Sequence, residues 1–175
     1  FGEMLLADRL LQESSDGEEK KQLLIYLLDN QYASIGRQAY FVLFEKEAHE
    51  MIQQGATKEV LEEKYMELLQ EQFGQMQVPE DFKHEFSYIP HIHASPFYCY
   101  AYAWGNLLVL SLFERYRQEG EAFKEKYTQL LSAGGSDSAA KLLKEIMDID
   151  VTDETFWQGG FAIIGEEVQK LKNLH

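Results

Sequence analysis

The sequence contains a single cysteine, Cys99, so no disulfide can form within the chain. A free cysteine is typical of a reducing compartment, and we expect a cytoplasmic protein. Proline is also scarce, with three in 175 residues, and no segment alternates between apolar and polar residues as a half-buried strand does. The few helix breakers and the missing strand signal predict an all-α fold.

The sequence also has few basic residues and no long apolar run. Sixteen Lys and Arg stand against thirty Asp and Glu, and the formal net charge is −14. Because nucleic-acid binding depends on clustered basic residues, we expect no nucleic-acid partner. The longest apolar stretch, Leu107 to Phe113, is much shorter than the ~20 residues that span a bilayer, so we expect no membrane anchor.

The beginning of the sequence lacks both an initiator methionine and the basic and apolar regions of a signal peptide. We therefore expect that Phe1 lies inside a longer chain. Hydrophobic residues make up 45% of the sequence and aromatic residues 13%, which is too rich for a disordered protein. The length and composition predict one folded domain or part of a larger one.

Apolar residues recur at helical spacing along most of the sequence. The predicted helices cover residues 3–11, 18–54, 57–74, 95–118, 121–131, 139–147 and 152–174. Their N-terminal caps are predicted at Thr57, Ser95, Ser136 and Thr152. In the longest helix, Gly36 indicates a kink or a close backbone approach. Residues 75–95 are predicted to form an ordered connection with one short helix.

The stretch from Ile89 to Gly105 is the most informative for function. His91 and His93 stand just before a predicted helix that begins at Ser95 and Pro96, and Tyr98, Tyr100 and Tyr102 follow on its first turns. Tyr98 and Tyr102 are four residues apart and share one helical face, whereas Tyr100 points elsewhere. An imidazole and phenols near a helix start could stabilise an oxyanion. The alternative is an aromatic-rich core helix with two loop histidines.

No zinc-binding helix motif is present. In H-E-x-x-H both imidazoles lie on one helical face beside the glutamate base. His49 and Glu50 are followed by Gln53 where the second histidine should stand, and His84 and Glu85 are followed by Tyr88. The His91 and His93 pair supplies two ligands where a zinc site normally needs three or four. We therefore assign no metal ligands to this chain.

Two other features are interpreted as structural. Cys99 lies among aromatic residues of the predicted helix, where a buried, inert thiol is expected. Gly134 and Gly135 precede Ser136 and could cradle an anion, but a helix terminator followed by a cap explains them more simply.

The sequence resembles the oligoendopeptidase F branch of the thimet-oligopeptidase-like zinc metallopeptidase family, which includes Pz-peptidases. The resemblance covers nearly the whole chain. Four stretches carry it in family order: F-G-E-M-L-L at 1–6, R-Q-A-Y-F-V-L-F-E-K at 37–46, I-P-H-I-H-A-S-P-F-Y-C-Y-A-Y-A-W-G at 89–105, and A-G-G-S-D at 133–137. The third stretch is the most specific of the four.

The resemblance implies a multi-helical gluzincin catalytic domain, of which residues 1–175 form a C-terminal part. In this family Zn²⁺ polarises the scissile carbonyl and activates water for the hydrolysis of short peptides. The implied catalytic residues are His93 and Tyr102, with His91 as the alternative histidine. His91, Tyr98 and Tyr100 are the implied substrate-binding residues.

The upstream zinc motif of the family is missing from these residues, so this chain alone is expected to be inactive. In the family pattern the third zinc ligand precedes the F-G-E-M segment, and Glu3 is therefore interpreted as a neighbouring or helix-packing carboxylate. The expected partners are short peptides and the missing N-terminal part of the same enzyme. Self-association through uncovered apolar surface is a further possibility. The alternative function is a non-catalytic, acidic helical interaction module.

Overall fold

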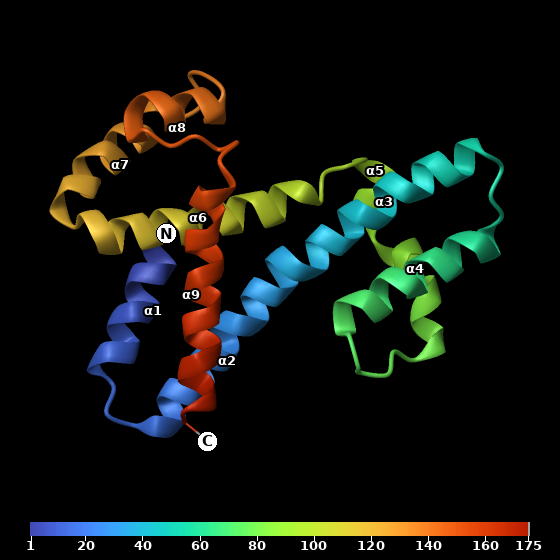
Figure 1. Cartoon of the computed structure of the whole chain (residues 1–175), viewed down its shortest axis with the longest axis horizontal. Helices are drawn as coiled ribbons and strands as arrows, with labels where there is room; N and C mark the ends of the chain where they lie inside the picture. Colours follow the sequence, from blue (N-terminus) through green and yellow to red (C-terminus); the bar gives the residue numbers. More distant parts are fainter. Residues whose placement is uncertain (175) are drawn as a thin grey trace. The chain divides into compact units, whose positions relative to one another are not determined.

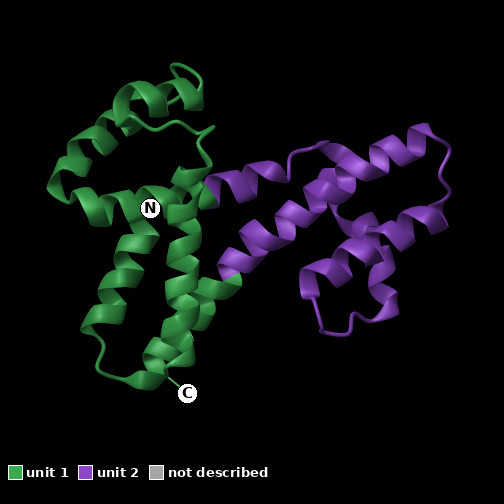
Figure 2. Cartoon of the chain, viewed as in Figure 1, with its two compact units in different colours: residues 1–29, 107–175 green, residues 30–106 purple. Residues whose placement is uncertain are grey.

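The computed structural model describes residues 1–174, and all the regular elements among them are helices (Figure 1). The predicted all-α fold is confirmed. The chain forms two compact units (Figure 2). Unit 1 contains Phe1–Asp29 and the chain from Leu107 onward, and unit 2 contains Asn30–Asn106. None of the described helices combines the length and apolar character needed to cross a bilayer.

The helices of unit 1 follow the predicted pattern closely. They are α1 (Gly2–Glu13), most of α2 (Gly17–Gln31), the later part of α6 (Tyr100–Glu119), α7 (Glu121–Ala133), α8 (Ala139–Met147) and α9 (Glu154–Lys172). Two caps differ from the prediction. The Ser138 side chain, and not Ser136, accepts the N–H of Lys141, and Asp153, and not Thr152, accepts the N–H of Thr155. In both cases a second capping residue stands closer to the first helical turn.

The core of unit 1 is built from aromatic and aliphatic side chains. The ring of Phe1 stacks on the fully buried ring of Phe123 at a centroid distance of 5.7 Å and lies 4.4 Å from the ring of Tyr127. Helix α9 approaches α6 closely at Gly160, which is buried. A Cβ atom at Gly160 would lie 2.8 Å from Cδ1 of Leu107 and 2.8 Å from Oγ of Ser111. A glycine is therefore required at this crossing.

We expect Gly160→Ala to lower the free energy of unfolding by about 1–3 kcal/mol, because the new methyl group overpacks the α6–α9 contact. Gly165→Ala on the same helix is the matched control. A Cβ atom at Gly165 meets nothing within 4 Å, so this variant should gain about 0.5–1 kcal/mol from helix propensity. Chemical denaturation of both variants measures the difference. Equal effects of the same sign would show that the crossing is not tight.

Unit 2 surrounds a second core. Its elements are the π-helical segment η1 (Tyr32–Gly36), α3 (Arg37–Gln53), α4 (Lys58–Phe73), the 3₁₀ helix η2 (Glu80–Tyr88) and α5 (Pro90–Ala94), followed by the first residues of α6. The irregularity predicted at Gly36 is the end of the π-helical segment. One buried cluster joins these elements: Phe41, Phe44, Ala48, Tyr65, Leu68, Leu69, Ile89 and Cys99.

The structure differs from the prediction at the start of α6. Ser95 and Pro96 do not open the helix, because residues 95–99 form a turn and α6 begins at Tyr100. Phe97 in this turn has a φ of 60°, a left-handed conformation that disfavours side chains with a Cβ atom. The histidines lie on the short helix α5, within the connection for which one short helix was predicted.

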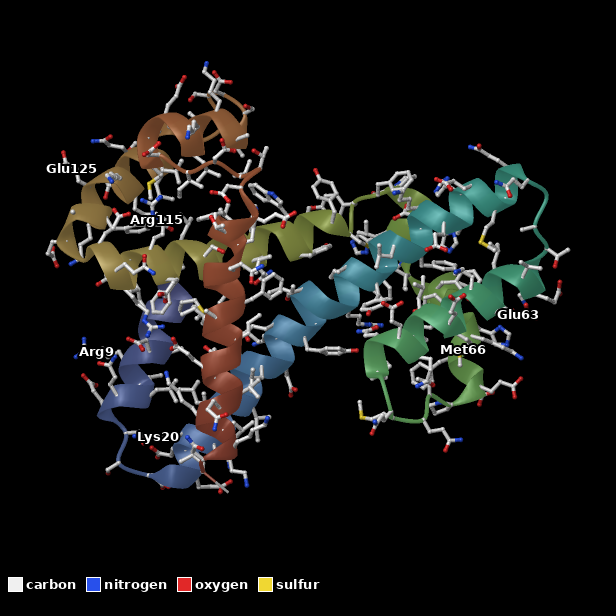
Figure 3. The ribbon with its side chains drawn as sticks, in the orientation of Figure 1. Arg9, Lys20, Glu63, Met66, Arg115 and Glu125 are labelled. Carbon is white, nitrogen blue, oxygen red and sulfur yellow. The ribbon has the colours of Figure 1, made fainter. Side chains whose placement is uncertain are left out.

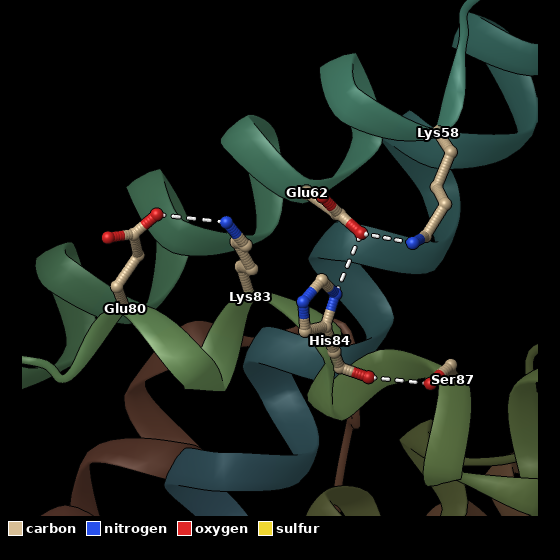
Figure 4. A network of polar contacts seen from close by, with 6 residues as sticks. All are labelled: Lys58, Glu62, Glu80, Lys83, His84 and Ser87. Carbon is tan, nitrogen blue, oxygen red and sulfur yellow. Dashed lines mark hydrogen bonds and ion pairs between the residues drawn. The ribbon is translucent and has the colours of Figure 1, made fainter.

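A polar network fastens η2 to α4 (Figure 4). Nδ1 of His84 lies 2.8 Å from Oε1 of Glu62, and the ammonium group of Lys58 lies 2.9 Å from the same oxygen. On η2 itself, Lys83 donates to Glu80 over 2.9 Å. The hydrogen bond from Lys58 is the first cause that lowers the pKa of Glu62 below 4.5, and the contact with His84 lowers it further. Glu62 is buried, so its charge depends on these partners.

We expect Glu62→Gln to lower the melting temperature more at pH 5 than at pH 3. The folded-state pKa of Glu62 is depressed, so its stabilising contribution is present above about pH 4.5 and is lost as the pH falls through that lower pKa. Thermal unfolding followed by circular dichroism at the two pH values measures this. Glu63→Gln, at an exposed neighbouring position on α4, is the control. A loss of melting temperature that is equally large at both pH values would contradict a stabilising role of the Glu62 charge.

Several basic side chains pair with acidic residues of their own helix. Arg9 pairs with Glu13 over 2.8 Å, and Lys64 pairs with Glu67 over 2.9 Å. Arg115 contacts Glu119 in the same i,i+4 arrangement. Figure 3 shows these charged side chains along the helices, with Arg9 and Arg115 labelled. Each exposed pair of this kind contributes little stability. The acidic residues that outnumber the basic ones give the surface its net negative charge.

Candidate active site

Helix α5 places the two histidines. Pro90 is its first residue, where the missing N–H of proline costs nothing and its fixed φ suits a helix. Ile89 before it is buried in the unit 2 cluster, and Ile92 packs against the same cluster. His91 is half-buried and His93 is exposed. The Pro90 signal was readable in the sequence, but the histidines were assigned to a connection.

The structure brings His91, Tyr98 and Tyr102 together, and we call these three residues the His–Tyr cluster. A hydrogen bond of 3.0 Å joins Nε2 of His91 and the hydroxyl of Tyr102. The ring of Tyr98 stacks on His91 at 5.7 Å and meets Tyr102 edge-on at 5.5 Å. Tyr98 and Tyr102 therefore lie side by side as predicted, although Tyr98 belongs to the turn and not to α6.

The other two predicted site residues lie apart from this cluster. His93 is exposed on α5, and within the described residues no hydrogen bond or ring contact joins it to the tyrosines. Tyr100 is the first residue of α6 and is also exposed. Both side chains are open to solvent.

A buried glutamate on α3 holds the turn between α5 and α6. Glu45 has no exposed surface, and its Oε1 accepts the backbone N–H of Phe97 over 2.6 Å. The ring of His49, one turn further along α3, lies 4.9 Å from the ring of Phe97. Cys99 is fully buried beside this arrangement. Burial, followed by the charge of Glu45, raises the pKa of the Cys99 thiol, which fits the predicted inert cysteine.

Glu45 is not among the residues predicted for the site, although the sequence carries a signal for it. Phe41, Phe44 and Ala48 are apolar at spacings of three and four, so they mark the buried face of α3. Glu45 stands next to Phe44 on that face, where a charged residue needs a reason. A carboxylate within an apolar helical stripe indicates a buried polar contact.

A second polar contact ties η2 to α3 and α4, directly before α5. Arg37 donates to one carboxylate oxygen of Glu85, and the buried Tyr65 donates its hydroxyl to the other over 2.7 Å. Burial is the first cause that raises the pKa of Tyr65, and the hydrogen bond to Glu85 adds to it. Tyr65 therefore stays protonated as a hydrogen-bond donor. This contact fixes the end of η2 from which α5 and its histidines follow.

The described residues do not gather three His, Cys, Asp or Glu side chains that could hold a metal ion. The described residues therefore do not form a zinc site by themselves. Glu3, the one carboxylate weighed as a ligand from the sequence, accepts a 3.4 Å hydrogen bond from Tyr26 of α2. This exposed contact links α1 to α2. The chemistry that the chain does offer is hydrogen-bond donation by phenols beside an imidazole.

Solved structures share this fold. The crystal structure of oligoendopeptidase-F from Enterococcus faecium superimposes with a TM-score of 0.90 at 24% identity, over 98% of this chain and 33% of that one. A protein from Chlamydophila abortus, described as a peptidase, gives a TM-score of 0.90 at 31% identity, over 99% of this chain and 29% of its own. The helical architecture is thus that of a segment of these larger proteins.

The sequence comparisons establish the family. The profile of peptidase family M3 matches residues 1–162, and the chain belongs to this family. An oligoendopeptidase F homologue of Borreliella burgdorferi is 31% identical over 99% of this chain, and the group B oligopeptidase PepB of Streptococcus agalactiae is 30% identical over 98%. The chain spans only 30% and 29% of the lengths of these two relatives. The resemblance to oligoendopeptidase F that the sequence motifs indicated is confirmed.

Proposed function

We propose that this chain is the C-terminal segment of a zinc-dependent oligoendopeptidase that hydrolyses short peptides in the cytoplasm. The observation that carries the proposal is the His–Tyr cluster at the start of α6, in a chain that belongs to peptidase family M3. The segment supplies groups that bind the peptide and stabilise the oxyanion. The metal is held by residues of the parent enzyme outside this chain.

Tyr102 is the oxyanion donor in this proposal. Its hydroxyl has one hydrogen, and a protonated Nε2 of His91 can donate to the phenol oxygen over the 3.0 Å contact. The phenol hydrogen is then free to point at the oxygen of a peptide carbonyl as negative charge develops on it. Tyr98 stacks on His91 and keeps the ring in place. His93 and Tyr100 are exposed and contact the bound peptide.

The function as a whole is tested in the full-length parent. We expect it to cleave short peptides, to lose this activity when a chelator removes the metal, and to regain it with Zn²⁺. The isolated segment, which lacks the metal-binding residues, should be inactive under all these conditions. Cleavage of a quenched fluorescent peptide measures the activity. A chelator-resistant parent, or one without peptidase activity, would favour the non-catalytic interaction module.

We expect Tyr102→Phe in the full-length parent to lower kcat roughly 10²-fold, the scale of losing one oxyanion donor, with a smaller change in KM. Tyr88→Phe is the matched control, because Tyr88 is 82% exposed on η2 and lies outside the cluster. Steady-state kinetics on one peptide measures both variants. An unchanged kcat would remove Tyr102 from the catalytic residues.

The same assay separates the two histidines. The contact with Tyr102 supports His91 as the imidazole that acts in catalysis, whereas the sequence motifs pointed first to His93. If His91 orients the phenol, His91→Ala lowers kcat and His93→Ala acts mainly on KM. The reverse result would assign the catalytic role to His93.

A further inference from the structure

Glu45 is a buried charge without a complete set of partners. Its side chain is fully enclosed on α3, and one carboxylate oxygen, Oε2, has no hydrogen-bond partner within the described part of the chain. Oε1 accepts from the backbone of Phe97, and Nε2 of His49 lies 3.9 Å from the same oxygen. Burying a carboxylate with an unsatisfied oxygen is costly, and an apolar residue would pack in this cluster at no such cost. The position therefore requires a reason other than packing.

The partner of Glu45 is a strained part of the backbone. Phe97 adopts a φ of 60°, where a residue with a large side chain is disfavoured. Its N–H donates to Glu45, and its ring, which is partly exposed, lies against His49. Both contacts come from one face of α3. The conformation of the turn is thus fixed from outside by α3.

The turn that Glu45 holds leads directly into the His–Tyr cluster. The N–H of Tyr98 donates to the carbonyl of Ser95 over 3.0 Å, so Phe97 sits inside this hydrogen-bonded turn. The N–H of Tyr102 donates to the carbonyl of Cys99 over 3.2 Å. A shift of the backbone at Phe97 would move Tyr98 first and then the first turn of α6 with Tyr102. Within the described residues, no hydrogen bond or ion pair joins Glu45 to His91, Tyr98 or Tyr102.

We propose that Glu45 is a positioning residue, which holds the Phe97 turn by its hydrogen bond and so keeps Tyr98 and Tyr102 in register with His91. The inference rests on the proposed role of Tyr102 in the peptidase. What matters for this role is a hydrogen-bond acceptor at the right distance from the Phe97 N–H. A negative charge at position 45 is not required.

Three substitutions in the full-length parent separate acceptor from charge. Glu45→Gln keeps an acceptor oxygen and removes the charge. Glu45→Asp keeps the charge but withdraws the acceptor, and Glu45→Leu removes both. We expect Glu45→Gln to stay within about 3-fold of the parent kcat, and the other two to lose roughly 10- to 100-fold, because a misplacement of about 1 Å can cost 10²-fold. KM should change less than kcat in all three.

Glu167→Leu is the matched control. Glu167 is also a buried glutamate, but it lies on α9 in unit 1. This substitution should lower the melting temperature without changing kcat per folded molecule. Alkylation of Cys99, followed by mass spectrometry, gives a readout that is independent of activity. Cys99 lies at the end of the turn, so its thiol should react faster in Glu45→Asp than in the parent. Both proteins carry the negative charge at position 45, so a difference in rate reports a change in the turn and not in the charge.

The decisive comparison is the double variant. If Glu45 acts through Tyr102, adding Tyr102→Phe to Glu45→Leu causes little further loss of kcat. If the losses of kcat in the two single variants multiply in the double variant, the positioning role is overturned. It is also overturned if Glu45→Asp and Glu45→Leu keep full kcat while Tyr102→Phe alone is impaired. Full kcat in Tyr102→Phe alone would overturn the proposed role of Tyr102 and this inference with it. A Glu45→Leu variant that does not fold leaves the Gln and Asp variants and the Cys99 reaction to decide.

Discussion

The packing of consecutive segments against α3 is the constraint on which the candidate site depends. Helix η2 is fastened through Glu85 to Arg37, and the turn after α5 is fastened through Phe97 to Glu45. Between these two attachments lies α5, whose Ile92 packs against the shared apolar cluster. His91 is therefore held from both sides along the chain. A short helix of five residues would not be stable in isolation, so its geometry comes from these tertiary contacts.

This dependence explains which parts of the site could be predicted. The pairing of Tyr98 with Tyr102 followed from a spacing of four, and it survives although Tyr98 lies outside the helix. The start of α6 was misplaced because Ser95 and Pro96 carry the local signals of a helix start. Here Glu45 accepts the N–H of Phe97 and stabilises a turn instead. Such a contact spans 52 residues in sequence, and no local pattern reports it.

Most helices were predictable because their apolar faces and caps are local features. Thr57, for example, precedes α4 as expected. The cap at Ser138 was missed because three candidate residues stand together at 136–138, and Ser138 is the one directly before the first helical residue, Ala139. The crossing at Gly160 was also beyond local reasoning, since its requirement for glycine comes from Leu107 and Ser111 on another helix. Local periodicity thus identifies elements, whereas close contacts between elements set their exact ends.

The ion pairs within single helices have a consequence for how copies of the chain meet. Basic groups such as Arg9 and Lys64 are already paired with acidic residues of their own helices, so they attract the acidic surface of another copy less. Two approaching chains, each with a formal charge of −14, repel one another. The Debye length is about 10 Å at 0.1 M salt, so the repulsion reaches to longer distances only when the salt concentration is lower. Rising ionic strength weakens this long-range repulsion and leaves contact between exposed apolar side chains as the remaining force. The tendency of two copies of this chain to associate thus depends on the salt concentration of the solution.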